Sequence, residues 1–344
     1  MNNRNDWVDY AKAIGIVLVV IGHVERGLVS AGILSPSVPQ GLVDSVIYSF
    51  HMPLFFFLSG LFFIQTMNRR GAGGTVLSKI DTVFYPFVLW SILQGTIEVM
   101  LARYTNGDLT LHRVFELFWH PRAQFWFLYA LFMVFLVSVV MYRSRVLYLP
   151  ILAFWATLYT FQRYLPELGV GDFLVQNAVF FSLGVCFAAY PIGLDRRPAL
   201  WTLLIGSLFV IAEYLFHGVL DRKYVDRGAV SLAVAVLGIY LTVAVSMWAA
   251  AQPKRWVLLV GTMSMHIYLM HILTGSGVRV ILNRLFDVDD PAVHMVLGTL
   301  AGVIIPIVAA QLLLKMNLGF LFAIPDKLSL ARRWGAASSR AVAT

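Results

Sequence analysis

The chain has 344 residues, of which 59% are hydrophobic and only 13% are charged, and its mean hydropathy is +0.78. Soluble domains carry about a quarter charged residues, so this composition excludes an ordinary cytosolic enzyme, a disordered chain and a disulfide scaffold. The net charge of +8 would suggest nucleic acid in a soluble protein, but basic cytoplasmic loops explain it better here. We therefore expect a membrane protein that binds no nucleic acid.

Apolar stretches long enough to cross a bilayer follow one another along the chain. The fifth is the weakest, because Trp155, Thr157 and Tyr159 make it only moderately apolar. The pattern predicts an all-α integral membrane protein, a bundle of about ten transmembrane helices in one domain over residues 1–325. The expected spans are 10–29, 43–65, 82–102, 123–141, 146–162, 173–190, 199–217, 229–250, 257–280 and 293–322.

The distribution of basic residues predicts the orientation. With the N-terminus in the cytoplasm, most of the 26 Lys and Arg residues fall in segments on the cytoplasmic side, as membrane proteins prefer. This indicates an N-in, C-in topology with an even number of spans and a basic cytoplasmic tail over residues 326–344. The first apolar run is expected to be a retained helix, since Asp6 and Asp9 dilute the basic start that a signal peptide needs.

The first span carries ionisable residues where an apolar helix should have none. At 100° per residue, Asp9, Lys12 and His23 share one face, with His23 about 16 Å above Lys12. Ionisable groups inside a span are usually functional, so this face is a candidate active site. The alternative is that Asp9 and Lys12 pair at the interface and His23 is a hydrogen-bonded core residue.

The second span combines His51 with Pro53, which removes a backbone donor. One interpretation is a broken helix that lines a substrate cavity; the other is a kinked packing helix. Arg69 and Arg70 then precede a glycine-rich stretch, residues 71–74, with Lys79 beyond it. Such a flexible basic loop suits an anionic ligand such as a phosphate, although the orientation bias alone also produces such arginines.

Four motifs together resemble the membrane acyltransferase 3 family, in particular its fucose 4-O-acetylase-like branch. They are DYAKAIG at residues 9–15 followed by Gly22-His23, FHMPLFFFLSG at 50–60, QFWFLYALF at 124–132 and SMHIYLMH at 264–271. The resemblance covers nearly the whole chain.

The resemblance implies O-acylation of carbohydrate across a bacterial inner membrane. The donor would be an acyl-CoA, commonly acetyl-CoA, that reaches the protein from the cytoplasm as a co-substrate, with no tightly bound cofactor. His23 matches the essential histidine of the family and Lys12 its basic residue in the first helix. Arg4 is a loose match to an earlier basic position.

The chemistry assigns further roles to individual residues. His23 could act as the general base for a sugar hydroxyl or could itself accept the acyl group, and both routes stay open. Glu25, Asp9 or a carbonyl could orient its ring. The predicted donor-binding residues are Lys12, Arg69, Arg70 and Lys79.

The acceptor is expected to meet polar and aromatic side chains. Aromatic rings stack on sugars, so Trp126 and Tyr129 are candidates, although an interfacial aromatic belt explains them equally well. The predicted acceptor-binding residues are His51, Trp126, Tyr129, Arg122 and His271. His266 and His271 lie about 140° apart on their helix, so both cannot face one point. No metal site is expected, because the histidines lack a paired-ligand spacing.

Other functions stay open from the sequence. A multi-span carrier or flippase for a lipid-linked saccharide would also use intramembrane charges, and a purely structural role is a third possibility. The acceptor could be a lipopolysaccharide O-antigen, an exopolysaccharide, a nodulation-type lipo-oligosaccharide or an antibiotic-like glycoside. Succinyl could replace acetyl.

Overall fold

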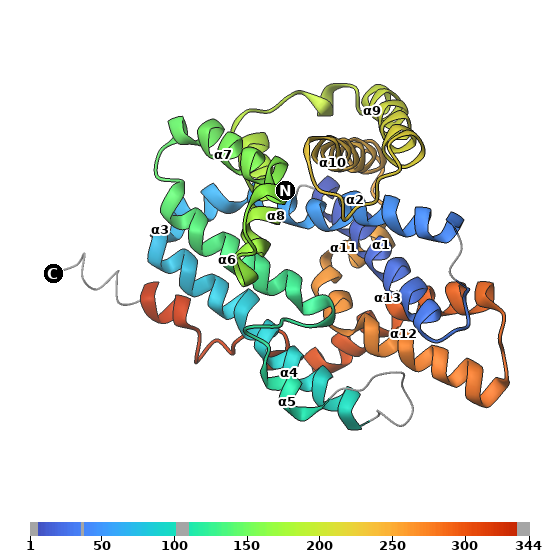
Figure 1. Cartoon of the computed structure of the whole chain (residues 1–344). Helices are drawn as coiled ribbons and strands as arrows, with labels where there is room; N and C mark the ends of the chain where they lie inside the picture. Colours follow the sequence, from blue (N-terminus) through green and yellow to red (C-terminus); the bar gives the residue numbers. More distant parts are fainter. Residues whose placement is uncertain (1–5, 36–37, 101–109, 336–344) are drawn as a thin grey trace.

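The computed structural model describes residues 6–35, 38–100 and 110–335; Arg4 lies outside them. These residues form helices and connecting turns without any strand (Figure 1). The α-helices are α1 Asp6–Ser30, α2 Val38–Leu61, α3 Phe63–Lys79, α4 Tyr85–Met100, α5 Leu111–Phe115, α6 Trp126–Met141, α7 Tyr148–Thr160, α8 Asp172–Ala189, α9 Pro198–Glu213, α10 Ala229–Ala249, α11 Arg255–Thr262, α12 Ser264–Phe286 and α13 Pro291–Lys315.

The helices confirm the predicted all-α membrane bundle. In the part of the chain that the structure describes, nine helical segments are long and apolar enough to cross a membrane, and a shorter apolar helix covers Arg145–Thr160. That shorter helix is the fifth expected span. Many large apolar side chains of α9 are exposed, among them Leu203, Val210 and Ile211, as expected of a surface that faces lipid.

The predicted flexible loop at residues 71–74 is wrong. Helix α3 continues through this segment and is interrupted only at Gly71, whose backbone is non-helical with φ 69° and ψ 175°. This φ lies in the region that glycine adopts without steric cost. The hydroxyl of Thr75 donates to the carbonyl of Gly71 at 2.7 Å, which helps the helix to resume. The π-helix Ile80–Phe84 then leads into α4.

The predicted broken helix at Pro53 is also wrong. Helix α2 runs from Val38 to Leu61 with Pro53 inside it. A proline removes one backbone hydrogen bond, and α2 is supported on several sides because it packs on α1, α8 and α10. At Gly60 an added Cβ would lie 2.1 Å from the Phe181 carbonyl oxygen, and at Gly184 it would lie 2.0 Å from the Phe57 oxygen. The backbones of α2 and α8 are therefore in direct contact.

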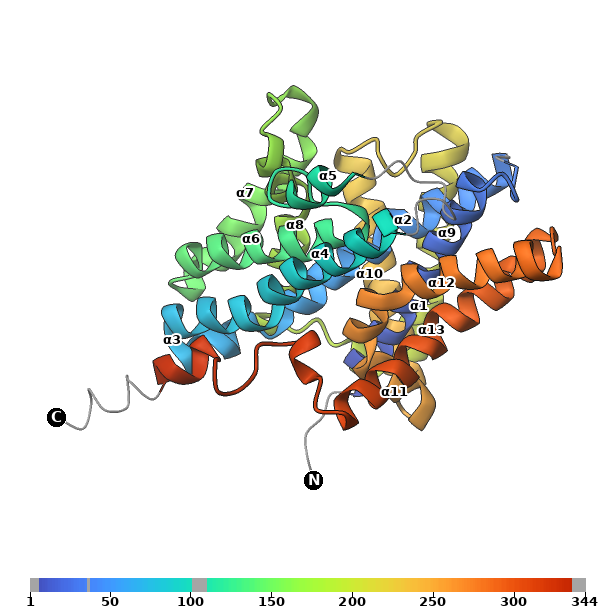
Figure 2. The ribbon, with the colours of Figure 1, turned by 90° about the horizontal axis from the view of Figure 1, so that it is seen from below.

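Helix α1 occupies the interior of the bundle, where it packs on α2, α10, α11, α12 and α13 (Figure 2). Glycines allow this close approach. Gly15 and Gly22 face the rings of Phe55 and Tyr48 on α2, and Gly302 of α13 receives Val20. The central position of α1 places His23 inside the protein.

The two ends of the bundle differ in construction. We call the end formed by the last turn of α1, the first turns of α2 and residues 220–228 the loop end. The other, the tail end, contains the start of α1, Gly71 and residues 319–335, which run from α13 to α3 (Figure 2).

The described part of the predicted tail packs on the bundle. Asp81 accepts hydrogen bonds from the Ser329 hydroxyl at 2.7 Å and from the Ala331 amide at 3.1 Å. The ring of Trp334 lies against Gly73. Residues 326–335 therefore cover the surface of α3 beyond Gly71.

The contact between α2 and α8 predicts a large effect of a single methyl group. Gly60→Ala should destabilise the protein by about 1–3 kcal/mol or more, because overpacking a closed helix contact forces the backbones apart. The melting temperature in detergent measures this. Gly277→Ala on α12 is the matched control, because nothing lies within 4 Å of its Cβ position; an equal loss in both variants would contradict the explanation.

Candidate functional site

Three histidines from three helices gather nearer the loop end, and we call His23, His51 and His271 the histidine cluster. The rings of His23 on α1 and His271 on α12 are 5.0 Å apart at an angle of 55°. His51 on α2 packs edge-on against Tyr48 at 4.5 Å, and the Tyr48 ring lies over Gly22.

Backbone carbonyls set the tautomers of two of these rings. His51 Nδ1 lies 2.7 Å from the Ile47 carbonyl oxygen, and His271 Nδ1 lies 2.8 Å from the Tyr268 oxygen. A carbonyl oxygen only accepts, so each Nδ1 carries the proton. In the neutral ring, each Nε2 then presents a lone pair.

These lone pairs have no partner among the described residues. His51 is 0% exposed and His271 2%, yet the Nε2 atoms of both and the Tyr48 hydroxyl are buried without a hydrogen bond. An unsatisfied buried polar group costs roughly 1–3 kcal/mol. Such groups gathered in one place can hydrogen-bond to the hydroxyl or carbonyl groups of a ligand or to water.

Arg26 lies one turn after His23, and hydrogen bonds and an aromatic ring hold its guanidinium in place. Its guanidinium donates to both carboxylate oxygens of Asp44, at 2.8 and 2.9 Å, and to the Tyr224 hydroxyl at 3.0 Å. It also lies 3.4 Å from the centre of the Tyr48 ring. Arg26 thus joins α1, α2 and the loop 220–228.

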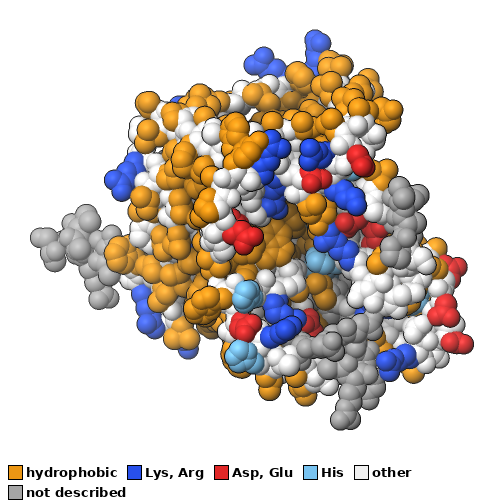
Figure 3. Space-filling view, in the orientation of Figure 1, with side chains coloured by type: hydrophobic (Ala, Val, Ile, Leu, Met, Phe, Trp, Pro, Cys, Tyr) orange, Lys and Arg blue, Asp and Glu red, His pale blue; other side chains and the backbone are white. Residues whose placement is uncertain are grey.

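Charged side chains gather on the face of the molecule shown in Figure 3, next to broad hydrophobic areas.

Asp9 and Glu25 cannot orient the His23 ring. Asp9 lies 14 residues before His23, about 21 Å along a straight helix, and forms an ion pair with Lys12 at 3.4 Å. Glu25 lies two residues after His23 and therefore about 160° around the helix. It is buried, and its Oε2 has no hydrogen bond among the described residues. Asp9, Lys12 and His23 share one face of the straight helix, as predicted. Asp9 and Lys12 pair with each other, however, several turns away from His23.

The predicted donor-binding residues lie on two separate helices of the tail end. Arg69 and Arg70 are exposed next to Gly71, and the Lys79 ammonium lies 4.2 Å from the centre of the Phe135 ring. Lys12 lies on α1, which packs on α2 and α10 to α13, whereas α3 packs on α6. The structure therefore does not bring all four cations to one point.

The predicted acceptor residues also separate into two groups. His51 and His271 belong to the histidine cluster, whereas Trp126 stacks on Phe173 at 6.0 Å and Tyr129 packs on the same ring at 6.1 Å. Aromatic packing thus accounts for both residues.

Arg122 belongs to a polar group directly before the short 3-10 helix η3, Ala123–Phe125. It donates to Glu98 at 3.1 Å, in a small pocket lined also by Ser91, Gln94 and Ala123. Gln94 and Gln124 exchange amide hydrogen bonds next to it. A link to the cluster runs through Tyr268, whose hydroxyl donates to the Gln124 carbonyl and whose ring lies 6.2 Å from His271.

Sequence reasoning missed several residues near the histidine cluster. Asp44, Tyr48 and Tyr224 surround Arg26, and Arg279 of α12 donates to the Gly27 carbonyl. Asp44 and Tyr48 are four residues apart, so they share a helix face. The signal that could have pointed to them is Arg26, because it has no acidic residue one turn away on its own helix and must find its counter-charge elsewhere. Among the described residues, no group of three or more His, Cys, Asp or Glu side chains could hold a metal ion.

Comparison with known proteins identifies the family. Residues 5–311 match the acyltransferase 3 family model, described as an acyltransferase domain. The chain belongs to this acyltransferase family. The narrower likeness to the fucose 4-O-acetylase-like branch stays a prediction.

Two curated relatives are similar over half of the chain. Both are named nodulation protein NolL, one from Mesorhizobium japonicum and one from Sinorhizobium fredii. The first is 29% identical over 198 residues, 56% of this chain; the second is 29% identical over 195 residues, 54% of this chain. The chain spans about half the length of each relative, 50% in both cases. No solved structure matches the chain significantly.

The family assignment gives the histidine cluster its context. A multi-pass membrane acyltransferase needs a group that handles the proton of the acceptor hydroxyl, and imidazole is the usual choice. The family favours an enzyme over the carrier or flippase that the sequence left open.

The contacts of Arg26 predict a stabilising role for Asp44. Asp44→Asn should lower the stability of the protein by about 1–2 kcal/mol, because it removes a charge-assisted pair whose partners are only partly screened by solvent. Thermal unfolding in detergent measures the change. Asp326→Asn is the control, because the ion pair of Asp326 with Arg332 is 71% and 66% exposed. Equal stabilities of the Asp44→Asn protein and the wild type would contradict the prediction.

Proposed function

We propose that this protein transfers an acetyl or similar short acyl group from acyl-CoA to a hydroxyl of a cell-envelope or exported carbohydrate. The family supports acyl transfer. The observation that carries the proposal is the pairing of His23 with His271 at 5.0 Å, next to buried ring nitrogens and a phenol that have no partner among the described residues.

The reaction needs one proton acceptor and one site for the developing oxyanion. In direct transfer, His23 removes the hydroxyl proton as the hydroxyl oxygen attacks the thioester carbonyl. The C–S bond then breaks and the CoA thiolate takes a proton. In the alternative route, His23 attacks the thioester carbonyl first, the C–S bond breaks and CoA leaves as the thiol with the imidazole proton. The sugar hydroxyl then attacks the acyl-imidazole and gives its proton to His271, and the C–N bond breaks as that proton passes to His23. The Tyr48 hydroxyl is available to donate to the oxyanion, and His51 and His271 to accept from sugar hydroxyls.

Donor and acceptor are proposed to approach from opposite ends. The exposed Arg69 and Arg70 suit the phosphates of CoA at the tail end, which we place in the cytoplasm in an N-in, C-in orientation. The pantetheine arm would then have to reach from α3 toward the histidine cluster. The acceptor would enter from the loop end, in the inner membrane of a bacterium. Because two relatives are named nodulation proteins, an exported lipo-oligosaccharide is the favoured acceptor class.

His23→Ala tests the central assignment. It should reduce transfer from labelled acetyl-CoA at least about 100-fold, since a positioned general base contributes 10²–10⁴-fold. The acceptor in this assay is base-treated envelope glycan, from which existing O-acyl esters have been removed. His266→Ala in the otherwise unchanged protein is the control, because His266 lies outside the histidine cluster and packs against Phe322 at 4.5 Å.

The same assay separates the two routes. Without acceptor, an acyl-enzyme leaves label on the wild-type protein and none on the His23→Ala protein, whereas direct transfer labels neither. Full transfer by a folded His23→Ala protein would refute the assignment of His23.

The donor end predicts a selective effect on CoA binding. Replacing both Arg69 and Arg70 with Ala should raise the KM for acetyl-CoA about tenfold with little change in kcat, because exposed cations contribute uniform binding of the phosphates. Turnover of acetyl-pantetheine, which lacks the nucleotide phosphates, should not change. Arg143→Ala, another exposed arginine, is the control. An unchanged KM for acetyl-CoA would show that the phosphates bind elsewhere.

A further inference from the structure

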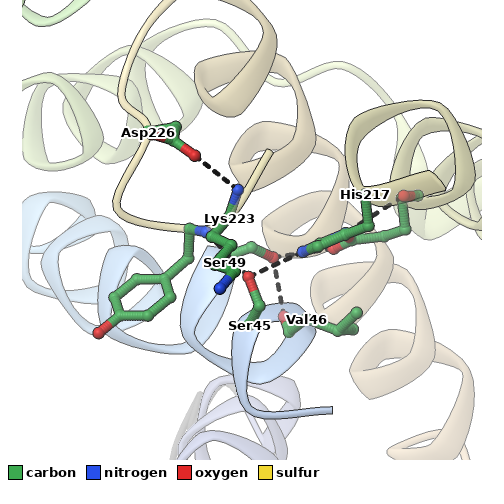
Figure 4. A network of polar contacts seen from close by, with 8 residues as sticks. Ser45, Val46, Ser49, His217, Lys223 and Asp226 are labelled. Carbon is green, nitrogen blue, oxygen red and sulfur yellow. Dashed lines mark hydrogen bonds and ion pairs between the residues drawn. The ribbon is translucent and has the colours of Figure 1, made fainter. Parts of the chain in front are cut away.

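A buried polar network outside the histidine cluster connects α9 to α2 and to the loop 220–228 (Figure 4). We call Ser45, Glu213, His217 and Tyr224 the Ser45 clasp. The Ser45 Oγ lies 2.8 Å from His217 Nε2, and the backbone N–H of Tyr224 donates to the same oxygen at 2.8 Å. His217 Nδ1 hydrogen-bonds to the backbone carbonyl oxygen of Glu213 at 3.2 Å and lies 2.9 Å from one carboxylate oxygen of the same residue. The other carboxylate oxygen accepts from Ser49 at 2.9 Å.

The directions of these hydrogen bonds define what the clasp does. Because a carbonyl oxygen only accepts, His217 Nδ1 carries the proton toward the Glu213 carbonyl, and in the neutral ring Nε2 then accepts from the Ser45 hydroxyl. The Ser45 oxygen in turn accepts from the Tyr224 amide. The order serine, histidine, acid resembles a catalytic triad, but Ser45 is only 2% exposed and its oxygen already accepts from a backbone amide. The network therefore fixes the position of residue 224 instead of activating a nucleophile.

Tyr224 is the point at which the loop reaches the candidate site. Its hydroxyl accepts from Arg26 at 3.0 Å, and its ring lies 5.3 Å from the Tyr48 ring. The remainder of the loop is held by a turn in which the Lys223 amide donates to Asp226 at 2.8 Å. The clasp thus determines where the Tyr224 ring lies relative to Arg26 and Tyr48.

Anchoring α9 to α2 does not require these polar groups. Phe209, Phe216 and Val234 already form an apolar cluster there, and Phe209 packs on Phe50 at 5.4 Å. Burying carboxylate, imidazole and hydroxyl groups costs free energy that apolar packing of the same volume would not. The polar network therefore does more than hold the helices together, and the contact that it adds is the hydrogen bond from the Tyr224 amide to Ser45.

We infer that His217 is a positioning residue, which holds Tyr224 through Ser45 as one wall of the binding site for the acceptor sugar. The Tyr224 ring offers a face on which a pyranose can stack, whereas the Tyr48 ring is covered by the Arg26 guanidinium at 3.4 Å. The remaining N–H groups of Arg26 and lone pairs of Asp44 can bind the sugar hydroxyls. This inference rests on the proposed function and names the part of the site that selects the acceptor.

Steady-state kinetics test the role of His217. His217→Ala should raise the KM for base-treated envelope glycan about tenfold, the effect of losing a buried hydrogen bond. The KM for acetyl-CoA and the hydrolysis of acetyl-CoA without glycan should not change. His217→Gln, which can still hydrogen-bond to Ser45, should recover part of the affinity. Ser207→Ala on α9 is the control, because its hydroxyl is exposed and donates to the Leu203 carbonyl of its own helix.

A second measurement does not depend on turnover. Hydrogen exchange of the peptide 220–228 in nanodiscs should accelerate in His217→Ala and Ser45→Ala and stay unchanged in Ser207→Ala. Where His217→Ala does not fold, Tyr224→Phe replaces it in the kinetic test, since it removes only the hydroxyl that meets Arg26 and should also raise the glycan KM.

The outcomes separate the two proposals. An active enzyme whose glycan KM is the same in the wild type, His217→Ala and Tyr224→Phe overturns the positioning role alone. An equal fall of kcat for transfer and for hydrolysis, with unchanged glycan KM, also overturns it. A wild-type protein that transfers no label to glycan overturns the proposed function, and the positioning role with it, even where hydrogen exchange confirms the clasp.

Discussion

A guanidinium within an apolar bundle must be both neutralised and hydrogen-bonded, and the contacts that satisfy Arg26 organise the loop end of this protein. Asp44 supplies the counter-charge through two hydrogen bonds, Tyr48 supplies a ring face and Tyr224 a hydroxyl. These partners come from α2 and from the loop 220–228. Because Arg26 is one helical turn from His23, the same contacts define the surroundings of the candidate catalytic residue.

The second constraint is the close approach of helices around α1. Gly22 and Gly302 remove side-chain volume where α2 and α13 meet α1, so the helix can be enclosed on several sides. Enclosure brings His23 of α1 within 5.0 Å of His271 of α12. Two imidazoles so close, one of them with a fixed tautomer, form a group suited to moving a proton in a membrane acyltransferase. Packing and chemistry thus depend on the same turns of α1.

The two ends of the bundle have different physical characters. The tail end carries exposed arginines at Gly71, and residues 326–335 cover the adjoining surface of α3 through Asp81. The loop end carries buried networks with few free donors. Exposed cations suit a ligand with several negative charges, whereas buried networks around aromatic rings suit a neutral, hydroxyl-rich ligand. This division is the physical basis for the proposal that a CoA donor and a sugar acceptor meet at the histidine cluster.

The sequence by itself determined the class of the protein and the approximate spans, and it made His23 a candidate catalytic residue, because hydropathy and intramembrane charge are local properties. It also placed Asp9, Lys12 and His23 on one face, as a straight helix requires. Helical geometry alone could not show which partner each would meet. Asp9 pairs with Lys12 far from His23. Pro53 does not break α2, because neighbouring helices support that helix on several sides. The glycine-rich segment after Arg70 is helical instead of a loop, because Gly71 alone takes up the non-helical backbone. Only the tertiary structure joined His23 to His271, Arg26 to Asp44 and Ser45 to His217, because residues distant in the chain meet through helix packing, which no local pattern encodes.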